Sequence, residues 1–193
     1  MCRKRLILAI ALVTLSLFTV GLGVASAQDV FKVNYFSNNV PDVAPDATLR
    51  IGNPGTTYSN LCAMIYVFDN DQQLTECCGC VETPNGLRTL SVGKDLTSNP
   101  LTGVRSNNGQ LKIVSAAVNN SPCDATGNVA PKATLRAWAT HIQNKVGAAY
   151  PITETESSEA TLGATELANL QALCFFLNLL GSGHGICSCG YGD

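Results

Sequence analysis

The sequence predicts a mainly β protein: an antiparallel β-sandwich of the immunoglobulin-like type with one C-terminal helix, stabilised by disulfides. Short strand-like apolar segments recur between residues 30 and 142, separated by turn sequences such as Pro84-Asn85-Gly86. Of the 9 cysteines, all but Cys2 follow residue 60, which is typical of a small domain that folds in an oxidising compartment. A β-barrel is the nearest alternative fold.

The strands are expected from their apolar patterns and from the turns between them. We expect strands at residues 30–36, 47–51, 61–68, 73–81, 87–92, 111–118 and 132–142. Residues 61–68 are apolar on both faces, as in a central strand that is covered from two sides. Asn85-Gly86 and Asn107-Asn108-Gly109 predict turns, because both residue types tolerate a positive φ.

A helix is predicted near the C-terminus, at residues 165–180. Thr165 can cap it, Glu166 suits its positively polarised first turn, and Gly181 can end it. It is apolar on most of its surface but short for a membrane span, so we expect it to pack on the sheet. The alternative is that it holds a partner or a membrane, since an apolar helix must be buried somewhere.

The first 27 residues predict a cleaved signal peptide. Arg3-Lys4-Arg5 precede an apolar run, and the small residues Ala25-Ser26-Ala27 follow it, which is the pattern recognised during export. We therefore expect a secreted protein, in the periplasm, on the cell surface or outside the cell, with no membrane span after cleavage. The remaining chain is expected to form a β domain of residues 28–160, on which a helix and a cysteine-containing tail, residues 161–193, are packed.

The charge of the exported chain argues against nucleic-acid binding. Without the three N-terminal basic residues, the 12 Lys and Arg become 9 against 14 Asp and Glu, a net charge near −5. The cations are scattered singly, whereas nucleic-acid binding needs clustered cations that displace counterions.

The cysteines of the exported chain are all candidates for disulfide bonds. They are Cys62, Cys77, Cys78, Cys80, Cys123, Cys174, Cys187 and Cys189. Eight cysteines allow 105 pairings, among which the sequence alone does not choose. A hairpin of residues 61–69 and 73–81 makes a Cys62–Cys80 bond feasible. Cys77 or Cys78 would then join the tail through Cys187 or Cys189, and Cys123 would join Cys174.

A metal site is the alternative use of the same cysteines. Zinc needs about four thiolate or imidazole ligands, and the set Cys77, Cys78, Cys80, His184, Cys187 and Cys189 could supply them. However, the spacing is not that of a zinc knuckle, and exported thiols are normally oxidised. We therefore expect disulfides, no metal and no cofactor.

No catalytic constellation is evident in the sequence, so we expect a non-enzymatic protein. His141 lies in a predicted strand, where a structural role is commonest, and His184 lies in a glycine-rich tail without an adjacent nucleophile motif. Glu154, Glu156 and Glu159 are better explained as a solvated strand edge than as the carboxylate pair of a glycosidase.

Residues 61–69, together with Glu76-Cys77-Cys78-Gly79-Cys80 and the Cys187-Ser188-Cys189 tail, resemble a group of uncharacterised secreted proteins from soil bacteria. This resemblance implies neither an activity nor site residues.

These observations lead to the hypothesis of a secreted or cell-surface module for adhesion, envelope structure or protein interaction. Its partner would be a protein or a surface of unknown identity. An alternative is a self-assembling extracellular subunit, in which the strand at residues 30–36 is donated to a neighbour's sheet. A secreted metal-binding protein or hydrolase is the third possibility.

Overall fold

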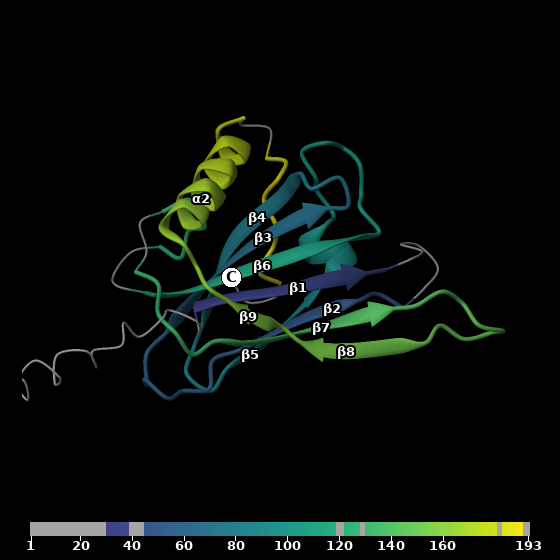
Figure 1. Ribbon diagram of the computed structural model, residues 1–193, viewed down its shortest axis with the longest axis horizontal. Helices are drawn as coiled ribbons and strands as arrows, with labels where there is room; N and C mark the ends of the chain where they lie inside the picture. The colour runs from purple at the N-terminus through teal and green to yellow at the C-terminus, as the bar shows by residue number, and fades with distance from the viewer. Residues whose placement is uncertain (1–29, 39–44, 119–121, 128–129, 181–182, 191–193) are drawn as a thin grey trace, which may run out of the picture.

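The computed structural model describes residues 30–38, 45–118, 122–127, 130–180 and 183–190 (Figure 1). The predicted signal peptide, residues 1–27, lies outside them. The described strands are β1 (Phe31–Ser37), β2 (Thr48–Gly52), β3 (Leu61–Asp69), β4 (Leu74–Glu82), β5 (Leu87–Ser91), β6 (Asn108–Ala117), β7 (Arg136–Ile142), β8 (Ile152–Glu156) and β9 (Ser158–Ala160). A short π-helical turn, η2 (Val92–Leu96), follows β5, and the helix α2 (Ala164–Leu179) follows β9.

These strands form one mixed, curled sheet. Its order is β4-β3-β6-β1-β7-β2-β5, with β8 paired to β7 and β9 paired to β1. The pairings are antiparallel except at β1 and β7, which are parallel where Ser37 lies opposite His141. The prediction of an exclusively antiparallel sheet is therefore wrong, because β1 lies between β6, to which it is antiparallel, and β7, to which it is parallel. The immunoglobulin-like sandwich stays a prediction.

Strand β3 confirms the expectation of a central strand. It pairs with β4 on one side and β6 on the other, and Leu61 to Val67 are all buried. Ala63, Ile65 and Val67 pack into one apolar cluster, inside the curl of the sheet. Cys62, Met64 and Tyr66 pack into a second cluster on the opposite face. The alternation of a strand thus explains why both faces of this segment are apolar.

Helix α2 covers the second cluster, above β4 and β3 (Figure 1). Leu170, Cys174 and Leu177 are its buried residues. The helix is where the sequence predicts it, but its N-cap is Gly163, which makes no side-chain hydrogen bond, and Thr165 lies inside the first turn. The mainly β class and the single C-terminal helix are confirmed for the described residues.

Of the two predicted turns, the first is confirmed, since Asn85 adopts a positive φ of 62° between β4 and β5. The bounds of the second, Asn107-Asn108-Gly109, are wrong. Asn107 lies in a bend, but Asn108 and Gly109 lie within β6. Position 109 of β6 requires a glycine, because a Cβ at this position would lie 2.0 Å from the carbonyl oxygen of Phe68.

Disulfide cluster and candidate interaction surface

The eight cysteines form four disulfides, three of which start from β4. The bonds are Cys62–Cys123, Cys77–Cys174, Cys78–Cys187 and Cys80–Cys189, with Cα–Cα distances of 5.2 to 5.8 Å. The expected link from Cys78 to the tail is present. Cys62–Cys80 and Cys123–Cys174, which were considered feasible from the sequence, are not bonded, so these two predictions are wrong.

The register of the β3–β4 hairpin explains the first of these errors. A bulge between Val67 and Phe68 shifts the pairing, so that Cys62 lies opposite Val81 and Cys80 lies opposite Ala63. Cys62 therefore points to the face covered by α2, and Cys80 points into the curl of the sheet. Since successive side chains of a strand lie on opposite faces, a shift of one residue separates two cysteines that looked adjacent.

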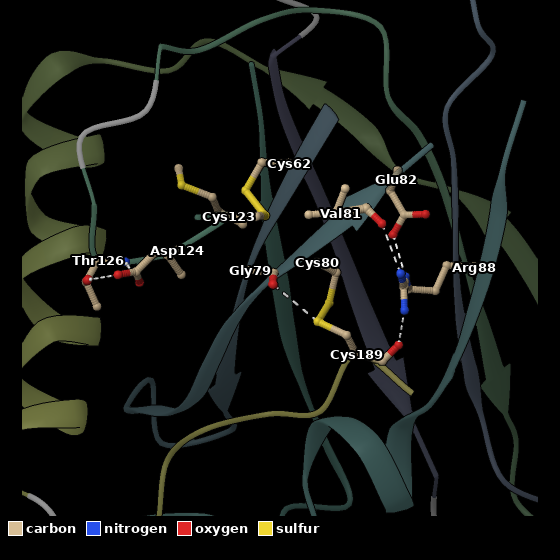
Figure 2. The surroundings of a disulfide bond; sticks show 12 residues. Cys62, Gly79, Cys80, Val81, Glu82, Arg88, Cys123, Asp124, Thr126 and Cys189 are labelled. Atoms are coloured by element: carbon tan, nitrogen blue, oxygen red, sulfur yellow. Dashed lines mark hydrogen bonds and ion pairs between the residues drawn. A yellow bond between two sulfur atoms is a disulfide. The ribbon is translucent and has the colours of Figure 1, made fainter. Parts of the chain in front are cut away.

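Cys62 instead bonds Cys123, whose loop crosses over β4 (Figure 2). Gly79 makes this crossing possible, because a Cβ at Gly79 would lie 2.2 Å from the carbonyl oxygen of Cys123. The glycine of the Cys78-Gly79-Cys80 motif is thus a packing requirement of the Cys62–Cys123 loop.

The C-terminal segment, residues 183–190, runs parallel to β4. Cys77 donates a backbone hydrogen bond to the carbonyl of Gly185 (2.8 Å), and Cys187 donates one to the carbonyl of Cys77 (3.3 Å). Disulfides from Cys78 and Cys80 then fix the segment at two successive positions on the inner face of β4. The segment covers part of an edge that would otherwise be open to pairing.

Arg88 joins the two ends of the curled sheet beside this segment (Figure 2). From β5, its guanidinium donates to Glu82 (2.7 Å) and to the carbonyl of Val81 (2.9 Å), both on β4. It also donates to the carbonyl of Cys189. A cavity of about 520 Å³ lies along this junction, with Arg88, Glu82 and Cys189 in its lining.

The six residues that the sequence offers as an alternative metal site do not all lie together in the structure. The sulfur atoms of Cys78, Cys80 and Cys189 lie within 4.8 Å of one another. Cys77 points to the other face of β4, where it bonds Cys174 under the helix, and His184 is exposed. The close sulfurs are paired in disulfides, so they are not the thiolates that bind zinc.

Glu76 on β4 is a buried carboxyl that the sequence analysis did not single out. It is 0% exposed, one oxygen accepts a hydrogen bond from the backbone of Asn99 (2.8 Å), and the other has no hydrogen-bond partner. Burial raises the pKa of Glu76 to about 7, against smaller opposite effects of the Asn99 hydrogen bond and the charge of Arg105. Asn99 in turn donates to Gly183 (2.6 Å) and accepts from Gly185 (2.8 Å), so this carboxyl supports the start of the C-terminal segment.

The residues considered for catalysis are not brought together. His141 is fully buried, its ring stacks on Tyr35 at a centroid distance of 3.8 Å, and its Nε2 lies 2.8 Å from Thr155 Oγ1. Burial lowers the pKa of His141, which favours the neutral ring. The three glutamates each have a cation: Glu154 pairs with Arg50, Glu156 with Arg136, and Glu159 with Lys32. This arrangement is typical of an exposed, charged strand edge.

Comparison with known proteins finds no matching family, no matching curated protein and no matching solved structure.

The side of α2 that faces away from the sheet carries large apolar residues. Its large exposed residues are Leu173, Phe175, Phe176, Leu179 and Leu180, each between 44% and 67% exposed; we call them the outer face of α2. Contiguous exposed apolar surface of this kind marks an interaction site more often than isolated apolar residues do. No helix among the described residues has both the length and the apolar content that a membrane span requires.

Proposed function

We propose that this chain is an exported, non-enzymatic protein-interaction module, and that the outer face of α2 is its interaction surface. The observation that carries the proposal is a helix that is fixed to the sheet on one side and exposes large apolar residues on the other. Export is supported by the predicted signal peptide and by the four disulfides, which form in oxidising compartments. A β-sandwich-like body would be the scaffold that carries the helix.

The inner side of α2 shows why the outer face is held in place. Leu170 and Leu177 pack on the sheet, and Cys174 between them is covalently bonded to Cys77. Near the N-terminal end, Glu166 pairs with Lys112 of β6 (2.6 Å). A surface that is already ordered before binding loses little conformational entropy when a partner docks.

The donor-strand alternative has less support in the structure. Strand β1, which would be donated, lies inside the sheet of its own chain, where it pairs with β6 along its full length. Its other side pairs with β9 and β7. In the described residues β1 therefore has no long unpaired edge to offer to a neighbour.

The proposal is tested by measuring the size of the complex in which the exported chain occurs. Cells would produce the natural chain, a Phe175→Lys/Leu179→Lys variant, or the control Val104→Lys, which changes a 68% exposed apolar residue outside α2. On native gel electrophoresis of the exported fraction, we expect the natural chain and the control in a complex larger than the monomer, and the double variant as a monomer.

The same size for all three chains would contradict the proposal. So would turnover of an ester, peptide or glycoside substrate by the purified protein with loss of activity in His184→Ala, because the exposed His184 would then be a catalytic residue.

A further inference from the structure

The outer side of α2 has a regular pattern of small and large residues. Ala168, Ala172, Phe175 and Leu179 follow one another at intervals of four, three and four residues, and all are exposed. We call these four residues the outer seam. Apolar residues at this spacing line one side of a helix and are the pattern with which two helices pack against each other.

The opposite side of the same helix has a matching pattern, and these residues pack on the sheet. Leu167, Leu170, Cys174 and Leu177 are spaced by three, four and three residues and face the second apolar cluster of the sheet. The helix thus carries two apolar seams, of which the sheet covers one. The outer seam needs a different occupant.

From these observations, and resting on the proposed function, we propose that the occupant is a second copy of this chain, docked through its own α2 in the antiparallel direction. The seam is small in its N-terminal half, at Ala168 and Ala172, and large in its C-terminal half, at Phe175 and Leu179. An antiparallel pair centred between Leu173 and Cys174 places Phe175 of one copy opposite Ala172 of the other. The same arrangement places Leu179 opposite Ala168.

This self-complementarity is what a two-fold interface requires, because the same patch must fit its own copy. The alanines let the helices approach to the interaxial distance of about 8–10 Å seen for packed helices. The large residues of each copy then fill the space above the alanines of the other.

The area of the seam predicts a weak dimer. Phe175 and Leu179 are 55% and 67% exposed and together offer roughly 250 Å² in each copy. The proposed interface is therefore smaller than the area of about 1,000 Å² that is typical of stable complexes, as in transient association.

The charges favour a second copy over a lipid surface. Interfacial membrane helices use Lys and Arg to bind anionic headgroups, whereas α2 contains neither, and its one charged residue, Glu166, is paired with Lys112. Since the outer seam has no charge, docking leaves no ion without solvent or partner.

Sedimentation velocity of the purified, fully oxidised protein over a range of micromolar concentrations tests the proposal. We expect a monomer–dimer equilibrium that Phe175→Lys weakens by at least about tenfold, because Phe175 lies near the centre of the proposed pair. Val104→Lys is the matched control and should leave the dimer unchanged.

Ala172→Phe distinguishes specific pairing from general stickiness. This change adds apolar surface at an exposed position, so a non-specific patch would associate more strongly. In the proposed pair it fills the space that Phe175 of the second copy occupies, and we expect the dimer to weaken by at least about tenfold. Near-ultraviolet circular dichroism and intact mass would confirm that the variant is folded and oxidised.

A natural chain that stays monomeric at all concentrations, or a stronger association of Ala172→Phe, would overturn the proposal. A monomer that sediments with neutral phosphatidylcholine vesicles would overturn it in favour of lipid. If the pure protein is monomeric but the exported natural chain occurs in a larger complex that Phe175→Lys/Leu179→Lys abolishes, the proposed function stands and the second copy is not the partner.

Discussion

Glu76 shows how one residue can connect the sheet to the C-terminal segment. Its carboxyl accepts from the backbone of Asn99, and Asn99 is hydrogen-bonded to Gly183 and Gly185. The second carboxyl oxygen is buried without a hydrogen bond, so the ionised form is poorly solvated there. Protonation removes this unfavourable charge and explains why the pKa of Glu76 rises to about 7.

Glu76 should therefore make the folded chain less stable as pH rises. In the folded state Glu76 binds its proton more tightly than in the unfolded chain, where its pKa is near 4.5. Its contribution to the free energy of unfolding falls by about 3 kcal/mol as pH rises from about 4.5 to about 7 and remains lower above that range. Because the lowered pKa of His141 acts in the opposite direction, the natural chain is compared with Glu76→Gln. We expect the difference in stability between the two chains to change by about 2–3 kcal/mol between pH 5 and pH 8, measured by urea unfolding.

Glu159→Gln is the control for this prediction. Glu159 is a half-exposed carboxyl paired with Lys32 at the strand edge, so its loss should leave the pH-dependent fall in place. An equal fall in Glu76→Gln and in the natural chain would show that another group is responsible.

At the scale of the element, β4 combines three functions in nine residues. Cys77 holds the helix, Cys78 and Cys80 hold the C-terminal segment, and Gly79 leaves room for the Cys123 loop. Because adjacent residues of a strand point to opposite faces, the neighbouring Cys77 and Cys78 serve different layers of the molecule.

The contribution of the Cys77–Cys174 disulfide to the attachment of α2 can be measured in the whole protein. Replacing both cysteines by alanine should lower the free energy of unfolding by about 2–4 kcal/mol. It should also increase the rate of hydrogen exchange in α2 by at least about tenfold, because the helix then depends on Leu170 and Leu177 for its attachment.

The matched control removes Cys80–Cys189, which also starts from β4 but does not reach the helix. Exchange in α2 should be unchanged in that double variant. If both variants have the same effect on the helix, the disulfides act on global stability and not on the local attachment of α2.

A structural feature is predicted well from the sequence when the residues that determine it are close together in the chain. Local patterns placed the strands β1 to β5 and the helix well, and the apolar run of β3 correctly indicated a strand covered on both faces. The disulfide pairing depended on one bulge near Phe68, which no local pattern revealed. The bounds of β8 and β9 were not predicted, although Glu154, Glu156 and Glu159 were interpreted as a strand edge, because β8 is exposed along its whole length and has no apolar alternation.

The sequence indicates that α2 has a second apolar side, but it does not identify the residues of that side. An all-round apolar helix indicates that a second surface must be covered, yet only the packing of Leu170, Cys174 and Leu177 on the sheet identifies which side is left exposed. Glu76 gave no sequence signal, because its burial follows from the fold around it.

At the scale of the whole molecule, the curled sheet is closed by side chains and disulfides where backbone pairing ends. Strands β4 and β5 are the two ends of the sheet path, and Arg88 connects them through Glu82 and the carbonyl of Val81. The side chain of Glu82 is only 3% exposed. A buried carboxylate with a cationic partner is costly to leave behind when the cation is removed.

Arg88→Met keeps the aliphatic stem but removes this cation, so we expect a loss of about 3 kcal/mol in the free energy of unfolding, measured in urea. Adding Glu82→Leu should restore part of that loss, because the carboxylate that lost its partner is then removed as well. Arg136→Met, at the exposed pair with Glu156, should change stability by less than about 1 kcal/mol. If the effects of Arg88→Met and Glu82→Leu simply add, the two residues are not coupled, and closure of the sheet would rest on the disulfides of the C-terminal segment alone.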